Sequence, residues 1–544
     1  MTTAAPWTSP SRADGAGLPR VWTLGGRRLR VVGPPSLRDP RLHLSVVTLT
    51  ILLIGQLWLG FQVSVPQIGA ALVTCAVIEV VMTYRRSSVL VWPASALQTA
   101  TSVALIFRAI GTESGDRWTF HGWYLFAGVA ALSLATKYVI RFGGAHVFNP
   151  SNVGLVLAFL VLGSERVEPL DLWWAPLGWA MLLAYAVIVV GGVTIAGRLG
   201  LLTMGAAFWV ALAAGTGVLA ASGHCITARW SFTPVCGLHF WWIIVTSPEI
   251  LVFLFFMITD PKTVPSGRVA RMVFGVAVGV VSTFLLAPWG TEFGAKVGLL
   301  SGLVLVCATR PVWERRLPVP GSVDDEIGPW LRRAFSGGAT GGAAGALLRR
   351  GVVIAMVVAG LGLAVVGAGT PARATGDPVA AVEALPTITG TDPADLPQVT
   401  VDPRVAGLSA HLATPEGAQE LARSLALNLD VEAEALAAGD ASLLPAVDDG
   451  ERLLEMEAMI ADAGEVTIPT YSFDSLHLVV VFPGGLQRGA NAGLVSVGTV
   501  EDVSYGPTGE ELQRVRRPFS LTFSLRQTTS GRWLTTDTLA SPER

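Results

Sequence analysis

Apolar runs of about 18 to 22 residues, each followed by a short polar loop, recur along the first 310 positions of the chain. A run of this length crosses the hydrocarbon core of a bilayer, which is roughly 30 Å thick. The pattern predicts an all-α polytopic membrane protein with ten spanning helices and one further helix. The predicted spans are 44–62, 66–83, 88–109, 120–138, 147–163, 175–196, 200–221, 240–259, 270–288, 294–309 and, for the eleventh, 351–368.

Arginine and lysine gather in alternate loops, which orients the predicted helices because basic loops stay on the cytoplasmic side. The N-terminal segment 1–43 and the linker 311–350 both belong to the basic, cytoplasmic set. The intervening loops carry Glu113, Glu168 and Glu292 with fewer bases and are predicted to face outward. The eleventh helix then carries the chain out, so we expect a multi-pass protein of the cell membrane, in contact with lipid, whose C-terminal domain is extracytoplasmic.

The pattern changes after the eleventh span. Residues 369–403 are rich in Pro, Thr, Ala and Asp, as in an extended linker. Residues 404–544 then alternate helical and strand periodicity, which predicts a small extracytoplasmic α+β domain. Residues 371–544 hold 25 acidic residues against 11 arginines, which argues against nucleic acid as a partner. The predicted helices are 418–438 and 450–463, and the predicted strands are 476–482, 493–505, 519–525 and 533–539.

The order of these elements resembles the cystatin or nuclear-transport-factor type of cone, in which helices precede a curved sheet.

The four cysteines of the chain fall into two groups by their positions. Cys75 and Cys307 fall inside spans, where they serve as small packing residues. Cys225 and Cys236 share one outward loop, where oxidising conditions favour a disulfide. His224 and His239 flank them, but the spacing fits no standard zinc pattern, and we predict no metal.

The first motif that carries polar chemistry is Phe148-Asn149-Pro150-Ser151-Asn152, at the cytoplasmic start of the fifth span. Asn149 before a proline is a natural helix cap. Asn152 is not explained by capping. Two amides one turn apart at a helix start could bind a heterocycle edge or a phosphate, with His146 nearby as a cation or proton donor. Capping and ligand binding both remain open for this motif.

The second motif, Thr259-Asp260-Pro261-Lys262-Thr263, closes the eighth span. Asp260 could simply pair with a neighbouring basic residue at the interface. Upstream in the same span lies Ser247-Pro248-Glu249, where the proline predicts a break in the helix at membrane depth. An acid in that position is expensive unless it serves a function, so Glu249 is an intramembrane functional candidate.

Residues 44–310 resemble a family of membrane proteins shared by two electron-transport systems, namely the D-type component of the bacterial Rnf complex and the B-type component of the sodium-pumping NADH:quinone oxidoreductase. The resemblance rests on the stretch from His146 to Leu155 and on Phe255 to Arg268, and it extends to actinobacterial membrane proteins of enediyne biosynthesis. It implies a fold of two related five-helix halves with flavin held near Asn149, Asn152 and Asp260, close to Thr259 and His146.

The chain departs from this family at the site of covalent flavin. Members with covalent flavin mononucleotide attach it to the last Thr of a Ser-Gly-Ala-Thr motif after the fifth span, whereas the sequence here is Gly163-Ser164-Glu165-Arg166. No covalent FMN is therefore expected. The resemblance instead implies FMN or riboflavin bound noncovalently, and the aromatic residues near Phe240 and Phe255 could form walls for the ring.

The function expected from the resemblance is a membrane electron-transfer subunit associated with enediyne-type secondary metabolism. The chain lacks a nicotinamide-binding glycine motif and a cysteine cluster for iron–sulfur centres, so electrons would come from a protein partner. Whether the chain is itself an enzyme is left open. The alternative is a transporter or self-resistance protein that exports or sequesters the metabolite through a proton-coupled site at Glu249. A membrane anchor for the C-terminal domain is a third possibility.

Overall fold

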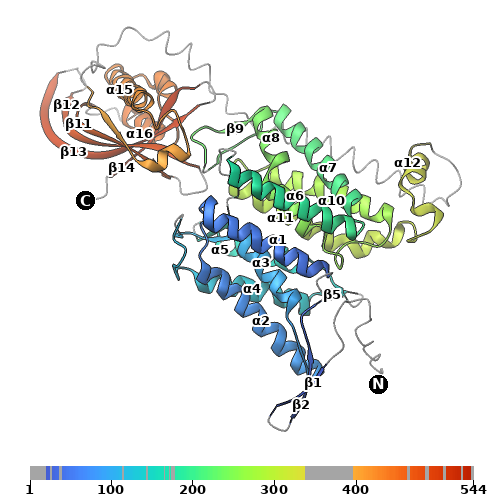
Figure 1. The fold of residues 1–544 in the computed structure, drawn as a ribbon. Coiled ribbons are helices and arrows are strands. Elements are labelled where there is room, and N and C mark those ends of the chain that lie inside the picture. Colours follow the sequence, from blue (N-terminus) through green and yellow to red (C-terminus); the bar gives the residue numbers. More distant parts are fainter. Residues whose placement is uncertain are drawn as a thin grey trace. The chain divides into compact units, whose positions relative to one another are not determined.

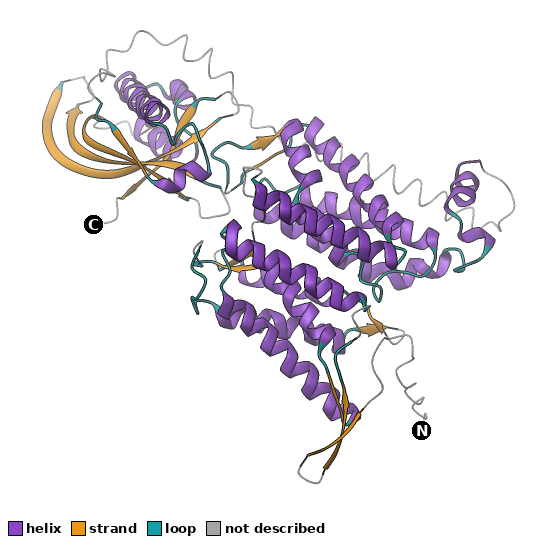
Figure 2. Cartoon of the chain, in the orientation of Figure 1, coloured by secondary structure: helices purple, strands orange, loops and turns teal. Residues whose placement is uncertain are grey.

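The computed structural model describes residues 20–24, 27–35, 39–112, 115–142, 145–164, 166–170, 172, 178–228, 230–336, 396–461, 466–483, 489–506, 510–528 and 531–540. The described residues form two compact units (Figures 1 and 2). The membrane unit takes its residues from Met1–Ser222, Trp241–Trp289 and Phe293–Gly369. The C-terminal unit takes its residues from Gly223–Phe240, Gly290–Glu292 and Thr370–Arg544.

The membrane unit is a bundle of apolar helices, and a helix lies at each of the ten spans predicted from the sequence. Seven helices in the described part of the chain are long and apolar enough to cross a membrane, while α3, α4 and α5 are shorter. The helices are α1 (Pro40–Ile54, continued by the π-helix η2, Gly55–Leu59), α2 (Val65–Ser87), α3 (Ala94–Ile106), α4 (Trp123–Val139), α5 (Pro150–Leu162), α6 (Trp179–Arg198), α7 (Leu202–Ala221), α8 (Gly237–Thr246), α9 (Pro248–Val252, continued by the π-helix η3, Phe253–Met257), α10 (Arg268–Leu286) and α11 (Glu292–Trp313).

These results support a membrane protein, although the count of ten crossings and the side on which each end lies remain predictions. Large apolar side chains stay exposed on the helices, among them Val73 on α2, Val190 on α6 and Val210 on α7. Such residues are expected on a surface that faces lipid. The predicted eleventh span at 351–368 lies outside the described residues.

Local signals in the sequence account for where several helices begin. Ser64 and Gln67 form a capping box at α2, because the Gln67 amide donates to Ser64 Oγ and the Ser64 amide to Gln67 Oε1. Glycines bring α7 and α10 close together, since a Cβ on Gly279 would lie 2.8 Å from the Phe208 carbonyl oxygen. Small residues at such crossings are typical of helices in membranes.

Two short segments of regular structure in the membrane unit were not predicted. The N-terminal segment 1–43 contributes β1 (Arg20–Leu24) and β2 (Arg27–Val32), and β2 pairs with β3 (Val89–Val91) before α3. The linker 311–350 contains α12 (Ile327–Ser336), an amphipathic helix.

The C-terminal unit is a curved sheet with two helices packed on one face (Figure 1). The helices α15 (Pro415–Ala438) and α16 (Gly450–Ala461) match the two predicted helices. The sheet order is β10–β11–β12–β13–β14, and only β10 pairs in parallel. The strands are β10 (Val399–Val401), β11 (Val466–Val481), β12 (Asn491–Tyr505), β13 (Glu511–Gln527) and β14 (Trp533–Ala540), so the sheet includes three residues that were predicted to belong to the linker 369–403.

The segment 223–240, which comprises the loop between α7 and α8 and the first turn of α8, belongs to the C-terminal unit. Its Phe232 is buried in the core of that unit, with its ring centroid 6.2 Å from that of Trp533 on β14. A disulfide between Cys225 and Cys236 closes the loop, where β8 (Cys225–Ile226) pairs with β9 (Val235–Cys236). The C-terminal unit is therefore completed by a loop from the region of the membrane helices. Its extracytoplasmic location remains a prediction.

Candidate functional site

The eighth span is broken where the sequence places Ser247-Pro248. The helix α8 ends at Thr246, Ser247 adopts an extended conformation, and Pro248 begins α9. The Ser247 side chain accepts a hydrogen bond of 2.9 Å from the Ile250 amide, which caps the new helix. Proline has no N–H and fits the first turn, so this sequence both interrupts one helix and starts the next.

Neighbouring helices satisfy the backbone carbonyls that the break sets free. The indole Nε1 of Trp209 on α7 donates to the Val245 carbonyl at 3.0 Å. The hydroxyl of Tyr185 on α6 donates to the Thr246 carbonyl at 3.1 Å. A broken helix inside a membrane is tolerated when other protein groups bind its exposed backbone, and these two side chains fulfil that condition.

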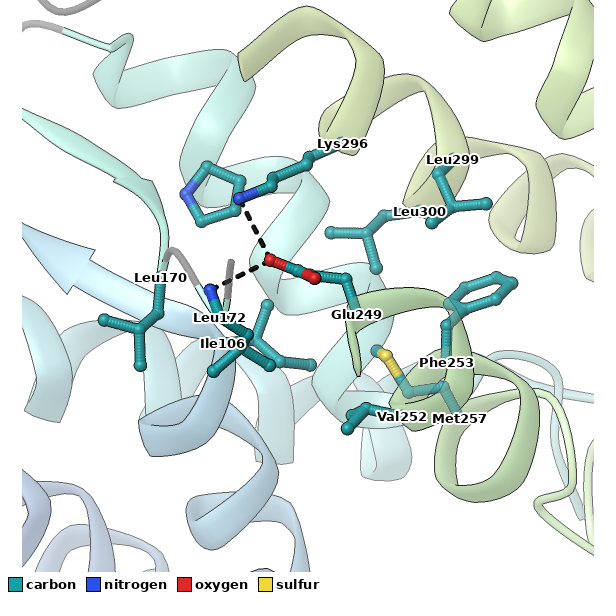
Figure 3. A pocket seen from close by; sticks show the side chains of 11 residues that line it. Ile106, Leu170, Leu172, Glu249, Val252, Phe253, Met257, Lys296, Leu299 and Leu300 are labelled. Carbon is teal, nitrogen blue, oxygen red and sulfur yellow. Dashed lines mark hydrogen bonds and ion pairs between the residues drawn. The ribbon is translucent and has the colours of Figure 1, made fainter. Parts of the chain in front are cut away.

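Glu249 lies directly after the break and pairs with a lysine from another helix. Its Oε1 atom is 3.3 Å from Lys296 Nζ on α11, and both side chains are 13% exposed. The same oxygen accepts a hydrogen bond of 2.9 Å from the Leu172 amide (Figure 3). Glu249 was predicted from the sequence, but its contacts with Lys296 and Leu172 were not. A lysine inside the apolar run 294–309 was the available signal, yet no pattern states which helices are neighbours.

A cavity adjoins this ion pair, with a volume of about 40 Å³. One wall comes from the end of α3 and from the segment after β7 (Val167–Pro169), and the other comes from α9, η3 and α11. Glu249 and Lys296 are the charged members of a lining that is otherwise apolar in the described part of the chain (Figure 3). The other lining residues are Ile106, Pro169, Leu170, Leu172, Val252, Phe253, Met257, Leu299 and Leu300.

A second buried ion pair holds the first wall of the cavity. After α3 the chain continues as β4 (Phe107–Ala109), which pairs antiparallel with β7. Arg108 and Glu168 stand opposite each other in this register and form an ion pair that is almost fully buried. Irregular backbone at membrane depth persists only where protein covers it. The strand pair supplies that cover, and Leu170 and Leu172 follow it beside Glu249.

The two motifs of the resemblance meet in space. His146 Nε2 lies 3.1 Å from Asp260 Oδ2, and the Asn149 side-chain amide donates to the Met257 carbonyl at 3.0 Å. Thr259 directly precedes Asp260, and its hydroxyl donates to the carbonyl of Phe255 in η3. The start of α5 is thus joined to the end of η3, although more than a hundred residues separate them in the sequence.

The polar atoms of these residues are largely occupied by the protein. Asn149 Oδ1 accepts from the Ser151 hydroxyl at 2.8 Å and caps α5 through the Asn152 amide at 3.3 Å. The Asn152 side chain donates to the Leu300 carbonyl on α11 at 2.9 Å. Asn152 Oδ1 is buried and lacks a hydrogen-bond partner among the described residues. Asn152 is therefore explained by helix packing as well as by ligand binding.

In this arrangement most donors and acceptors of the five predicted residues bind one another or the backbone, so few of them are available to a flavin. The aromatic residues of the eighth span do not form one slot either. Phe253 packs on Phe208 with a centroid distance of 5.4 Å, and the indole of Trp241 donates to the Ala213 carbonyl. Trp242 is exposed. Noncovalent flavin thus remains a prediction from the resemblance alone.

The membrane unit contains another half-buried lysine that provides a comparison for Lys296. Lys137 on α4 contacts Glu79 on α2 at 3.0 Å and donates to the Ser95 hydroxyl at 3.0 Å. The Tyr138 hydroxyl donates to the same carboxylate at 2.6 Å. This cluster lines no part of the cavity.

The C-terminal unit has a buried cluster of its own. Arg452 on α16 forms a bidentate ion pair with Glu432 on α15, and both are almost inaccessible. Asp448 lies beside this pair with 1% of its surface exposed. Burial and the neighbouring Glu432 carboxylate raise the pKa of Asp448 to about 10. No such constellation was predicted from the sequence.

Around the disulfide, His224 stacks edge-on against Phe240 with a centroid distance of 5.1 Å. Burial lowers the pKa of this imidazole. Within the described ranges, no group of three or more His, Cys, Asp and Glu side chains has an arrangement that could hold a metal ion.

Comparison with known proteins does not identify a function, since no protein family model and no curated protein matches the chain.

Proposed function

We propose that this chain is the membrane subunit of an electron-transfer system and that its own step is the movement of a proton or a small cation at Glu249 and Lys296. The observation that carries the proposal is the half-buried ion pair beside a helix break and a small cavity. Charged side chains are rare at membrane depth and mark ion or proton paths. A broken helix at such a place is typical of membrane proteins that move ions or solutes.

The size of the cavity favours a small ion over a metabolite. Pockets for drug-sized ligands measure roughly 300–1,000 Å³, whereas this cavity measures about 40 Å³. One water needs about 10–15 Å³ on the same kind of measure. The cavity therefore has room for an ion and one or two waters.

The electron-transfer part of the proposal comes from the resemblance. It is supported by the contact between the two motifs, in which His146 meets Asp260 and Asn149 meets the end of η3. Because no electron-carrying group is encoded in the chain, a partner protein would supply the electrons. The association with enediyne-type metabolism rests on the resemblance in the same way.

The proposal is tested in inverted membrane vesicles from a host strain that lacks the chromosomal copy of the chain. The strain is complemented with the wild-type chain, with Glu249→Gln or with Glu79→Gln. Respiration with NADH is followed by oxygen uptake, and ion uptake by a pH-sensitive dye and by ²²Na⁺. We expect Glu249→Gln to reduce chain-dependent ion uptake at least tenfold, while Glu79→Gln retains most of it. Equal uptake with wild type and Glu249→Gln would contradict the proposal.

The alternative is export of the metabolite through the same region, and the broken helix is the observation in its favour. The two functions separate in the deletion strain. Sensitivity to the metabolite, with NADH-driven ion uptake unchanged, would identify an exporter or self-resistance protein. Loss of ion uptake without a change in sensitivity would support the electron-transfer role proposed here.

Flavin content tests the redox part separately. The full chain is purified in detergent, its absorption spectrum is recorded, and any chromophore is released by acid and chromatographed. About one released flavin per chain would support noncovalent FMN or riboflavin, and Asp260→Ala should then lower that content. A folded protein without flavin would leave ion movement as the only chemistry proposed for this chain.

A further inference from the structure

We infer that residues 115–124, the segment between β4 and α4, form a platform that binds phospholipid at the level of the headgroups. Its anchors are four aromatic side chains with exposed fractions of 72%, 71%, 49% and 62%, namely Trp118, Phe120, Trp123 and Tyr124. An apolar surface of this kind marks a place where something other than water covers the protein. The inference concerns how the chain is seated in the bilayer and does not depend on ion movement at Glu249.

Buried polar side chains at the start of α2 hold the backbone of the platform. The Ser64 hydroxyl donates to the Thr119 carbonyl at 2.7 Å, and the Gln67 side-chain amide donates to the His121 carbonyl at 2.6 Å. Ser64 and Gln67 are fully buried and are also the two residues of the capping box. The platform therefore has a fixed backbone, although its aromatic side chains are exposed.

The platform also packs on β4, which follows the short helix α3. His121 Nε2 lies 2.8 Å from the Ile110 carbonyl oxygen, and a Cβ on Gly122 would lie 2.7 Å from Ala109 Cβ. The helix α3 has 13 residues, so it is about 20 Å long, whereas the hydrocarbon core is about 30 Å thick. A helix of this length cannot reach both headgroup layers. The segments attached to its ends therefore lie close to the hydrocarbon core.

The platform is continuous with helices whose exposed apolar side chains face lipid. Trp123 and Tyr124 are the first residues of α4. The Val65 amide, at the start of α2, donates to the Arg117 carbonyl at 2.9 Å. Further along the same two helices, Val73 and Leu132 are exposed apolar residues, as expected of a surface in contact with lipid. Lipid is therefore the neighbour that the rest of this surface requires.

Exposed aromatic residues at other helix ends agree with this placement. Trp58 in η2 and Trp179 at the start of α6 are both exposed, and their ring centroids are 5.2 Å apart. The predicted topology places the end of η2 and the starts of α4 and α6 on one side of the membrane. Trp and Tyr are enriched at headgroup level, because their rings are apolar and carry one polar group. Phospholipid headgroups fit this set of side chains.

The experiment measures the depth of a spin label in the full chain, reconstituted in nanodiscs of phosphatidylcholine. The free cysteines Cys75 and Cys307 are replaced by Ala. The label is attached at Arg117→Cys, which leaves all four aromatic residues in place. Its accessibility is measured to oxygen, which concentrates in the bilayer, and to a water-soluble nickel chelate. Labels at two exposed apolar positions give the limits, with Val190→Cys on α6 for hydrocarbon and Leu454→Cys on α16 for water.

We expect the label at Arg117→Cys to lie between these limits, with accessibility to nickel about threefold below that of Leu454→Cys. Replacing Trp118 and Phe120 together by Ala should raise this accessibility to the level of Leu454→Cys. The same double change should leave the label at Val190→Cys at hydrocarbon depth, which shows that the bundle is still folded. Trp118→Ala alone replaces the double change if the label at Val190→Cys is disturbed.

Three results would overturn the inference. Accessibility to nickel at Arg117→Cys equal to that at Leu454→Cys would show that the platform stands in water. Protection that persists without the aromatic side chains would show that other groups hold the segment. A label as inaccessible to nickel as that at Val190→Cys would place the segment in the hydrocarbon core. None of these results bears on ion uptake in vesicles, so the proposed function stands or fails separately.

Discussion

Asp448 in the C-terminal unit should make the stability of that unit fall as the pH rises above neutrality. Its carboxyl group is buried beside Glu432, and its pKa is raised to about 10 from an ordinary value of 3.8. Between these values the folded unit holds a proton that the unfolded chain releases. The stabilisation from this proton is greatest below pH 3.8 and is lost as the pH rises toward the folded pKa. Asn resembles the protonated carboxyl group, so Asp448→Asn should remove the dependence.

The expected magnitude follows from the slope for one proton, about 1.4 kcal/mol per pH unit. The buried His224 has a lowered pKa, so at more acidic pH it would make the stability rise with pH, opposite to the effect of Asp448. The range from pH 7 to pH 9 avoids this effect, because it lies above the ordinary pKa of histidine. Over these two units the wild type should lose about 3 kcal/mol of unfolding free energy. Asp448→Asn should lose little, and its C-terminal unit should be the more stable of the two at pH 9.

The assay is pulse proteolysis of the full-length protein in detergent across a urea gradient, with a C-terminal tag to follow the C-terminal unit. Brief proteolysis cleaves the unfolded fraction and so reports the folding equilibrium. Urea midpoints are measured at pH 7, 8 and 9 for the wild type and for Asp448→Asn. A wild-type midpoint that does not change with pH, or an equal decrease in both proteins, would refute a buried proton at Asp448.

Three further changes test the packing. Gly279→Ala should lower the stability of the membrane unit by about 1–3 kcal/mol in thermal unfolding, because its Cβ would lie 2.8 Å from a carbonyl oxygen. The control is Gly69→Ala on α2, whose Cβ would meet no atom within 4 Å. Equal effects of the two changes would contradict the close crossing of α7 and α10. Phe232→Ala should destabilise the C-terminal unit by about 3 kcal/mol in pulse proteolysis, and an unchanged urea midpoint would contradict its place in that core. Glu168→Gln should cost about 3–5 kcal/mol by removing the charge that compensates Arg108, and unaltered thermal unfolding would count against a buried pair.

The sequence predicts what depends on local length and periodicity. The ten apolar runs could be placed because a membrane helix must meet a length requirement within its own segment. The break at Ser247-Pro248 could be predicted because proline acts on the turn in which it lies. The two helices and the presence of the four long strands follow from their periodicity, but β11 and β13 begin ten and eight residues before the predicted strands 476–482 and 519–525. The strand β10 is three residues long and was not recognised.

The rest depends on which segments become neighbours. Glu249 is recognisable as an acid in an apolar run, but its partner Lys296 is 47 positions away on another helix. Asn149 could be a cap or a ligand, and capping does not explain Asn152. The carbonyl groups on η3 and α11 that their side-chain amides bind cannot be identified from the sequence. Phe232 was not identified from the sequence, because nothing in its own segment indicates that it packs in the core of the C-terminal unit.

Phe232 also has a consequence for the order in which the protein matures. Ribosomes make this residue long before they make β14, against which it packs. Domains usually fold as units as they emerge during synthesis, but this one needs its last strand together with a loop that was inserted much earlier. A fragment that begins in the linker 369–403 would lack Phe232, which belongs to the core of the C-terminal unit. Correct folding of the C-terminal unit therefore reports that the loop between α7 and α8 has been inserted and closed.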